Sequence, residues 1–183
     1  MKLLKKILIT IACIIGILLI TALFVRKDYS VERAITINKP KQDVFNYIRF
    51  VKNQDSYNKW VMADPNAKKE FKGTDGTTGF IYSWDSRNNK VGQGEQEIKN
   101  ITDGSGVDLE IHFIRPLEGI AHAYMSTESI SGNDTKLTWG MKGRNRYPLN
   151  LTNLIIDKML GGDLEESLGN IKRILENNSS LNK

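Results

Sequence analysis

The pattern of apolar and polar positions separates an uncharged N-terminal run from a patterned body. Ile7 to Val25 carry no charge, and Thr10, Gly16 and Thr21 are the interruptions. As a helix rising ~1.5 Å per residue, this run is about 28 Å long, close to the ~30 Å hydrocarbon core of a bilayer. Lysines precede it and basic residues close it. The run therefore predicts a transmembrane helix with a polar clamp at each end.

A cleavable signal peptide is the alternative explanation for this run. Such a peptide has a shorter apolar core, of about 7–15 residues, and ends in small residues. Ala22 is the small residue near the end, and Leu23, Phe24 and Val25 follow it, so we expect an uncleaved anchor. Cys13 lies in the middle of the run, which does not fit a lipoprotein signal. The lysine bias predicts a cytoplasmic N-terminus and an extracytoplasmic body.

The body begins with a strand and two short helices. Residues 29–37 alternate and are rich in β-branched side chains, which is typical of a strand. Pro40 suits the first turn of a helix that extends to about Phe50. A second short helix or turn carries Tyr57 and Trp60.

Short alternating runs then follow, separated by breaks rich in Gly, Asn, Asp and Ser. Breaks of this kind favour hairpins, so the sheet should be an antiparallel meander. Together with the first strand it has about seven strands. The six runs are 68–72, 79–85, 92–101, 107–115, 119–130 and 135–143.

The chain ends in a long helical pattern that starts at Pro148. Apolar residues recur at helical spacing from Ile156 to Leu175, in a stripe of more than five turns. Gly161 and Gly162 interrupt the stripe without changing its phase, which predicts one helix with a soft point. A fresh start after a break at Asp163 is the other possibility.

These elements predict an α+β domain in which the sheet curls around the last helix. A sheet buried on one face needs a cover, and the last helix is long enough to provide it. Because one helix cannot fill the concavity of seven strands, space should remain between sheet and helix. The predicted parts are an anchor over 1–27, a domain over 28–178 and a frayed tail over 179–183.

Composition and charge exclude several classes of function. One cysteine and two histidines argue against a disulfide framework or a metal centre, and no Walker loop, G-x-S-x-G or C-x-x-C is present. The net charge of +5 comes from five basic residues before Asp28. From Asp28 onward 21 basic residues face 21 acidic ones, which argues against a nucleic-acid partner. No cofactor is expected.

Seven segments in this order resemble the helix-grip fold of the START-related, birch-pollen-allergen-like (SRPBCC) superfamily, and specifically its polyketide cyclase/dehydrase and lipid-transport branch. The resemblance spans about Val31 to Leu175 and implies a cavity for a hydrophobic ligand. The segments are VERAITINKPKQDVFNYI, NKW followed by DP, GTDGTTGFIYSWDS, VGQGEQEI, IHFIRPLEG, TKLTWGMKG and IDKMLGGDLEESLGNIKRIL.

The two-residue period of the strands indicates which side chains face the helix. Gln96 and the hydroxyl of Tyr82 are the expected contacts of a polar head group, and Trp60 is expected at the mouth. Ordinary core packing is the alternative role for each residue. The predicted cavity residues are Trp60, Tyr82, Trp84, Gln96, Ile111, Phe113, Met125, Trp139, Met141, Ile155 and Met159.

The sequence therefore predicts a membrane-anchored protein that binds a hydrophobic small molecule or lipid without catalysis. His112 and His122 fall in the outward phase of their strands, and no catalytic residue is assigned. A cyclase or dehydratase is one alternative, and it would need an ionisable residue inside the cavity. An interaction or stress module without a ligand is the other.

Overall fold

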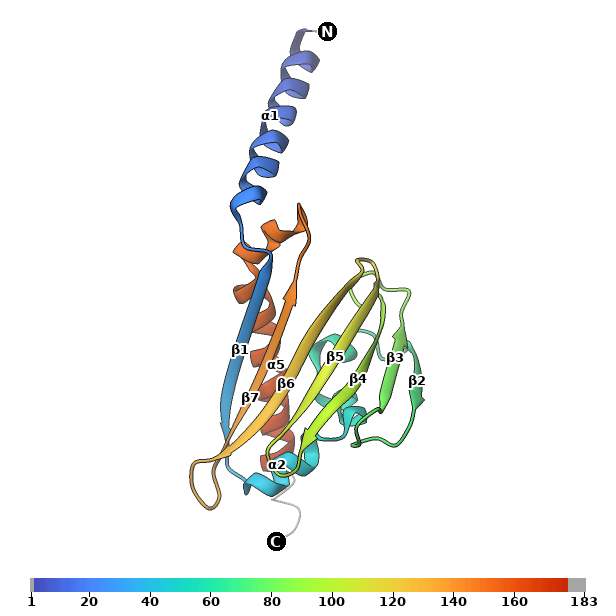
Figure 1. Cartoon of the computed structure of the whole chain (residues 1–183), viewed down its shortest axis with the longest axis vertical. Helices are drawn as coiled ribbons and strands as arrows, with labels where there is room; N and C mark the ends of the chain where they lie inside the picture. Colours follow the sequence, from blue (N-terminus) through green and yellow to red (C-terminus); the bar gives the residue numbers. More distant parts are fainter. Residues whose placement is uncertain (1, 178–183) are drawn as a thin grey trace.

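In the computed structural model, which describes residues 2–177, a long helix projects from a body built on one sheet (Figure 1). This helix, α1 (Lys2–Phe24), has almost all of its side chains exposed, and Ala22 is buried. It is long and apolar enough to cross a membrane, as predicted, although a signal sequence has the same properties. The predicted tail over 179–183 lies outside the described residues.

Within residues 2–177 the sheet has seven antiparallel strands in the order β1-β7-β6-β5-β4-β3-β2. The meander predicted from the breaks is confirmed, and each predicted strand ends within about two residues of the observed one. The first strand returns to pair with the last, with Val31 opposite Met141. The strands are β1 (Asp28–Ile37), β2 (Lys68–Lys72), β3 (Ile81–Asp85), β4 (Gln93–Thr102), β5 (Gly106–Arg115), β6 (Gly119–Ser129) and β7 (Thr135–Arg144).

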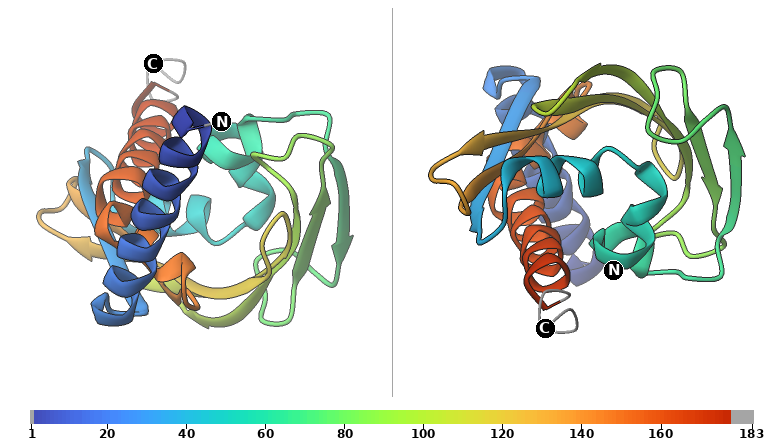
Figure 2. Two further views of the ribbon diagram at one scale, coloured as in Figure 1. Left: turned by 90° about the horizontal axis from the view of Figure 1, so that it is seen from above. Right: turned by 90° about the horizontal axis from the view of Figure 1, so that it is seen from below.

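The short helices between β1 and β2 close one side of the curled sheet (Figure 2). They are α2 (Lys41–Ile48), the 3-10 turn η1 (Val51–Asn53), α3 (Gln54–Tyr57) and α4 (Lys59–Met62). The start of η1 is fixed by the Asp75 carboxylate, which accepts hydrogen bonds from the Val51 and Lys52 amides at 2.8 and 3.1 Å. The short helices thus cover the part of the concave face that the last helix does not reach.

The last helix, α5 (Ile156–Asn177), is continuous through the glycine pair, as predicted. Pro148 does not begin it, however. It precedes a separate 3-10 segment, η2 (Leu149–Leu154), and Ile155 caps this segment before α5 starts. The apolar stripe of α5 faces the sheet, and Leu164, Leu168 and Ile171 are its fully buried members.

The structure explains why a glycine stands at position 161 in the middle of α5. Arg33 on the concave side of β1 reaches under α5, where its guanidinium binds Glu165 at 2.6 Å and Asp157 at 3.0 Å. A Cβ on Gly161 would lie 2.1 Å from an Arg33 nitrogen, whereas a Cβ on Gly162 would meet nothing within 4 Å. The first glycine therefore makes room for the ion pairs between β1 and α5.

The junction between α1 and the body is held by two asparagine side chains of the η2 segment. The Asn150 amide donates to the carbonyls of Ala22 and Val25 at 2.7 and 2.8 Å. The Asn153 amide donates to the carbonyls of Arg26 and Lys27 at 2.9 Å each. Buried backbone acceptors need such partners, so these bonds fix the course of the chain as it leaves α1.

Candidate ligand-binding site

Six of the predicted cavity residues are buried on the concave face of the sheet. The two-residue period therefore predicted the correct face for these strands, and Trp60 on α4 and Trp84 on β3 are half-buried. Burial alone fits both core packing and ligand contact, so their role as cavity walls stays a prediction. The six are Tyr82, Gln96, Ile111, Met125, Trp139 and Met141.

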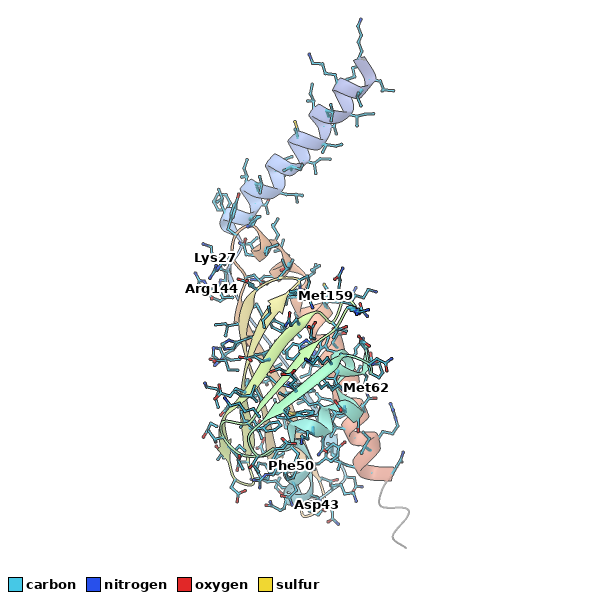
Figure 3. All side chains as sticks on the ribbon, turned by 90° about the vertical axis from the view of Figure 1, so that its right-hand side faces the viewer. Lys27, Asp43, Phe50, Met62, Arg144 and Met159 are labelled. Carbon is cyan, nitrogen blue, oxygen red and sulfur yellow. The ribbon has the colours of Figure 1, made fainter. Side chains whose placement is uncertain are left out.

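The other three predicted residues lie at the surface. Phe113 is exposed but still forms an edge-to-face contact with Trp84, with ring centroids 6.3 Å apart. Ile155 and Met159 are exposed at the start of α5, and Figure 3 shows Met159 on the side of the body toward which α1 leans. The helical stripe does not include either of them, because the buried side of α5 runs through Leu164 and Leu168.

An aromatic cluster occupies the middle of the interior around Trp139. Tyr57 and Trp60 meet the Trp139 indole edge-to-face, with centroids 5.9 and 6.3 Å away. The Trp139 Nε1 is buried and has no hydrogen-bond partner within residues 2–177. The Tyr57 hydroxyl donates to the Met125 sulfur at 3.9 Å, and thioether sulfur is a weak acceptor. These two interior donors therefore lack a good acceptor among the described residues, which costs free energy unless another molecule supplies one.

Gln96 is already paired within the protein. Its amide exchanges hydrogen bonds with the buried Gln54 amide at 2.9 and 3.3 Å, and Asn58 donates to Gln54 at 3.0 Å. This exchange uses part of the hydrogen-bonding capacity of Gln96, since a primary amide has two donor hydrogens and an oxygen with two lone pairs, and its expected contact with a polar head group stays a prediction. For Tyr82, desolvation, with a smaller contribution from Asp55, raises the pKa of the hydroxyl to about 12.

Trp60 is held in place by charged groups at the surface. Its indole Nε1 donates to Asp163 on α5 at 3.1 Å. The Lys59 ammonium in turn binds Asp163 at 2.9 Å and Glu166 at 2.6 Å. These contacts tie α4 to α5 and hold Trp60 against Trp139, and its expected place at the mouth of a cavity stays a prediction.

The two histidines lie on the convex face, as the strand phase predicted. Both approach Glu110, His112 at 2.9 Å and His122 at 3.8 Å. The hydrogen bond from His112 is the largest cause of a lowered Glu110 pKa. A shallow hollow of about 330 Å³ beside His122 lies on this face, away from the interior. Among residues 2–177, no group of three or more His, Cys, Asp or Glu side chains could hold a metal ion.

Sequence reasoning missed Tyr57, Gln54 and Asn58 as interior groups. They lie on α3 and at its end, and a four-residue helix is too short to display a period that would assign its buried side. The residue types gave no other signal. Their burial follows from the way the short helices are enclosed between the sheet and α5.

Burial of Tyr57 predicts a loss of stability at alkaline pH. Desolvation is the largest cause that raises the Tyr57 pKa above its ordinary value of 10.0. A raised folded-state pKa means that this stability is complete below about pH 10 and is lost as the pH rises above it. Tyr57→Phe should therefore flatten the decline of the urea unfolding free energy between pH 9 and 11. Equal slopes for the variant and the wild type would contradict this account.

Comparison with known proteins identifies the fold. No family model matches the chain, and no curated protein matches it either. The helix-grip fold is shared with solved structures, and at 12% identity or less these show the fold alone.

Three of these structures illustrate the likeness. A point mutant of Thalictrum flavum norcoclaurine synthase, solved with a transition-state analogue, has a TM-score of 0.63 at 10% identity, over 83% of this chain and 96% of that one. A Chromobacterium violaceum protein has a TM-score of 0.58 at 10% identity, over 80% of this chain and 96% of that one. Ara h 8.0201 has a TM-score of 0.53 at 12% identity, over 82% of this chain and 99% of that one.

Proposed function

We propose that this protein is membrane-anchored through α1 and binds a hydrophobic small molecule or lipid between the sheet and α5. The observation that carries the proposal is the buried Trp139 indole, whose N–H has no acceptor among the described residues. A ligand with an apolar body and one oxygen acceptor would satisfy this donor and the Tyr57 hydroxyl while it packs against aromatic rings. Sites for such ligands combine apolar walls with few polar groups.

The organisation of the interior supports a place for the ligand. The buried residues form two clusters, one around Trp139, β1 and α5, and one around Phe80 and β3 to β6. Trp60 and Leu160 are half-buried and pack against both clusters. The seam between the clusters, under Trp60 and Leu160, is where side-chain movement would admit a ligand with the least loss of core packing.

A solved structure with the same fold holds a small molecule. The norcoclaurine synthase structure with the same fold contains a transition-state analogue. Catalysis in this chain would need an ionisable group next to the ligand. In the Trp139 cluster Tyr57 is such a group, and its raised pKa keeps it protonated, so the structure favours binding over base catalysis.

Retention of α1 is supported by the junction. Cleavage after Ala22 would remove this buried alanine from the body. The Asn150 amide would then lose its hydrogen bond to the Ala22 carbonyl. We expect the intact mass of the protein extracted from membranes to include residues 1–27. A mass that begins after Ala22 would contradict the anchor. The lysines before α1 favour a cytoplasmic N-terminus and a body outside the cytoplasm.

The binding proposal is tested by titrating the detergent-purified full chain with a fluorescent fatty acid, after native mass spectrometry for copurified lipids. Trp139→Phe removes the N–H but keeps an aromatic ring, and it should weaken binding about 2- to 10-fold, as for one hydrogen bond. Tyr124→Phe is the control, because Tyr124 bonds Glu32 on the convex face. Protein that copurifies empty and does not bind the probe would contradict the proposal.

A further inference from the structure

We propose that the end of the body next to α1 lies directly against the bilayer, with the η2 segment and the β5–β6 loop in the lipid headgroup region. The inference rests on the proposed role of α1 as a membrane anchor and adds an interaction surface for the body itself. We call this surface the docking end. Figures 1 and 3 show that α1 leaves the body at this end, and that the described C-terminal part of α5 lies at the opposite end.

The junction leaves no free linker between membrane helix and body. Three residues separate Phe24, which ends α1, from Asp28, which begins β1. The carbonyls of Ala22, Val25, Arg26 and Lys27 all accept hydrogen bonds from Asn150 or Asn153. A body held in this way cannot swing away from the membrane surface, so whatever the docking end exposes must meet lipid headgroups.

The η2 segment exposes apolar side chains at this end. Leu154 is 66% exposed and its neighbour Ile155 is 55% exposed, next to the first turn of α5. Large apolar side chains exposed together mark an interaction surface. A hollow of about 490 Å³ runs between Leu154 and Phe24, the last residue of α1. The others on this side are Tyr147, Leu149 and Met159.

The β5–β6 loop adds a second apolar group at the same end of the body. Leu117 at its tip is 59% exposed, and Ile114 and Ile120 flank it on the two strands. Elsewhere in the body, among residues 28–177, large exposed apolar side chains are scattered: Phe50, Met62, Phe71 and Ile130. Exposed apolar side chains are therefore concentrated at the end of the body from which α1 leaves, and not over the surface as a whole.

Charges at the docking end fit phosphate headgroups. Asp28 is paired with Arg144, and Asp157 shares the Arg33 guanidinium with Glu165. Four basic side chains at the docking end, by contrast, are exposed and have no ion-pair partner among the described residues. Glu118 in the β5–β6 loop is an acidic side chain that also lacks an ion-pair partner there. Unpaired cations next to apolar side chains are the pattern of a surface that binds anionic headgroups. The cations are Arg26, Lys27, Arg146 and Lys158.

Docking would place the entrance of the proposed site at the membrane. Met159 is exposed at this end, and the next residue, Leu160, packs against both core clusters under Trp60. A hydrophobic ligand could then pass from the bilayer to the seam without crossing water. The ligand class that fits is therefore a molecule already dissolved in the membrane.

The test places an environment-sensitive fluorophore on the full chain in phosphatidylcholine vesicles. In a Cys13→Ser background, single cysteines replace Leu117, Leu154 and, as a matched control, Ile130, which is 57% exposed in the β6–β7 turn at the far end. Lipids with a nitroxide near the headgroup should quench the labels at 117 and 154 at least about twofold more than the label at 130. Vesicles containing phosphatidylglycerol should increase this difference.

Equal quenching at the three positions would overturn docking, whether or not the protein binds the fluorescent fatty acid. Strong quenching at 117 and 154 in a protein that binds no fatty acid would support docking and contradict the carrier function alone. The thermal unfolding midpoint of each labelled variant confirms that the body is folded before quenching is compared.

Discussion

Replacing Leu168 by alanine should lower the free energy of unfolding by about 2–5 kcal/mol. Leu168 is 1% exposed and lies in the middle of α5, where it packs in the cluster that joins this helix to β1 and β7. Removing a fully enclosed leucine loses its transfer free energy and leaves a cavity, because the neighbouring strands cannot close over it. Urea unfolding of the full chain in detergent, followed by tryptophan fluorescence, measures the loss.

Met159→Ala is the control for this prediction, since it removes a similar side chain from an exposed position on the same helix. Its effect should be within about 0.5 kcal/mol, as for other surface substitutions. If both variants lost the same stability, α5 would not be packed against the sheet through its Leu164–Leu168–Ile171 face.

The glycine pair in α5 should respond to alanine in opposite directions. Gly162→Ala should stabilise the protein by up to about 1 kcal/mol, because its Cβ meets nothing within 4 Å and alanine is the better helix former. Gly161→Ala should destabilise it by about 1–3 kcal/mol, because its Cβ would overlap the Arg33 guanidinium, as in other overpacked sites. Thermal or urea unfolding of the two single variants measures the difference.

A double variant separates the overlap from other causes. In Gly161→Ala with Arg33→Met, the flexible methionine can move aside, so the alanine should cost clearly less than it does beside Arg33. An undiminished cost in the double variant, or a gain from Gly161→Ala alone, would show that Arg33 does not lie under this turn of the helix.

Local pattern was sufficient for the elements and for much of their order. Alternation and the Gly- and Asn-rich breaks predicted every strand, because side chains in a half-buried strand must alternate and hairpin turns need residues that tolerate their backbone angles. The apolar stripe predicted one C-terminal helix across Gly161 and Gly162. The first 27 residues predicted a helix suited to a bilayer. All these signals lie within a few neighbouring residues.

For the candidate site, the two-residue period of the strands identified the buried face but not the hydrogen-bond partners of its polar groups. Gln96 was assigned to the interior correctly, yet its partner Gln54 comes from a short helix with no readable period. Whether the Trp139 N–H meets an acceptor among the described residues depends on the side chains that pack around it, which are those of Tyr57, Trp60 and Met125. Such facts depend on three or four segments at once.

The sequence alone determined an apolar N-terminal helix, a seven-stranded meander and a long covering helix, since each follows from periodicity along the chain. The tertiary structure decided the rest: the ion pairs of Arg33 that explain Gly161, the Trp139 N–H that lacks an acceptor among the described residues, and the exposed apolar side chains gathered at the docking end. Contacts between residues distant in sequence produce these features, because folding brings together side chains whose separate positions carry no common pattern.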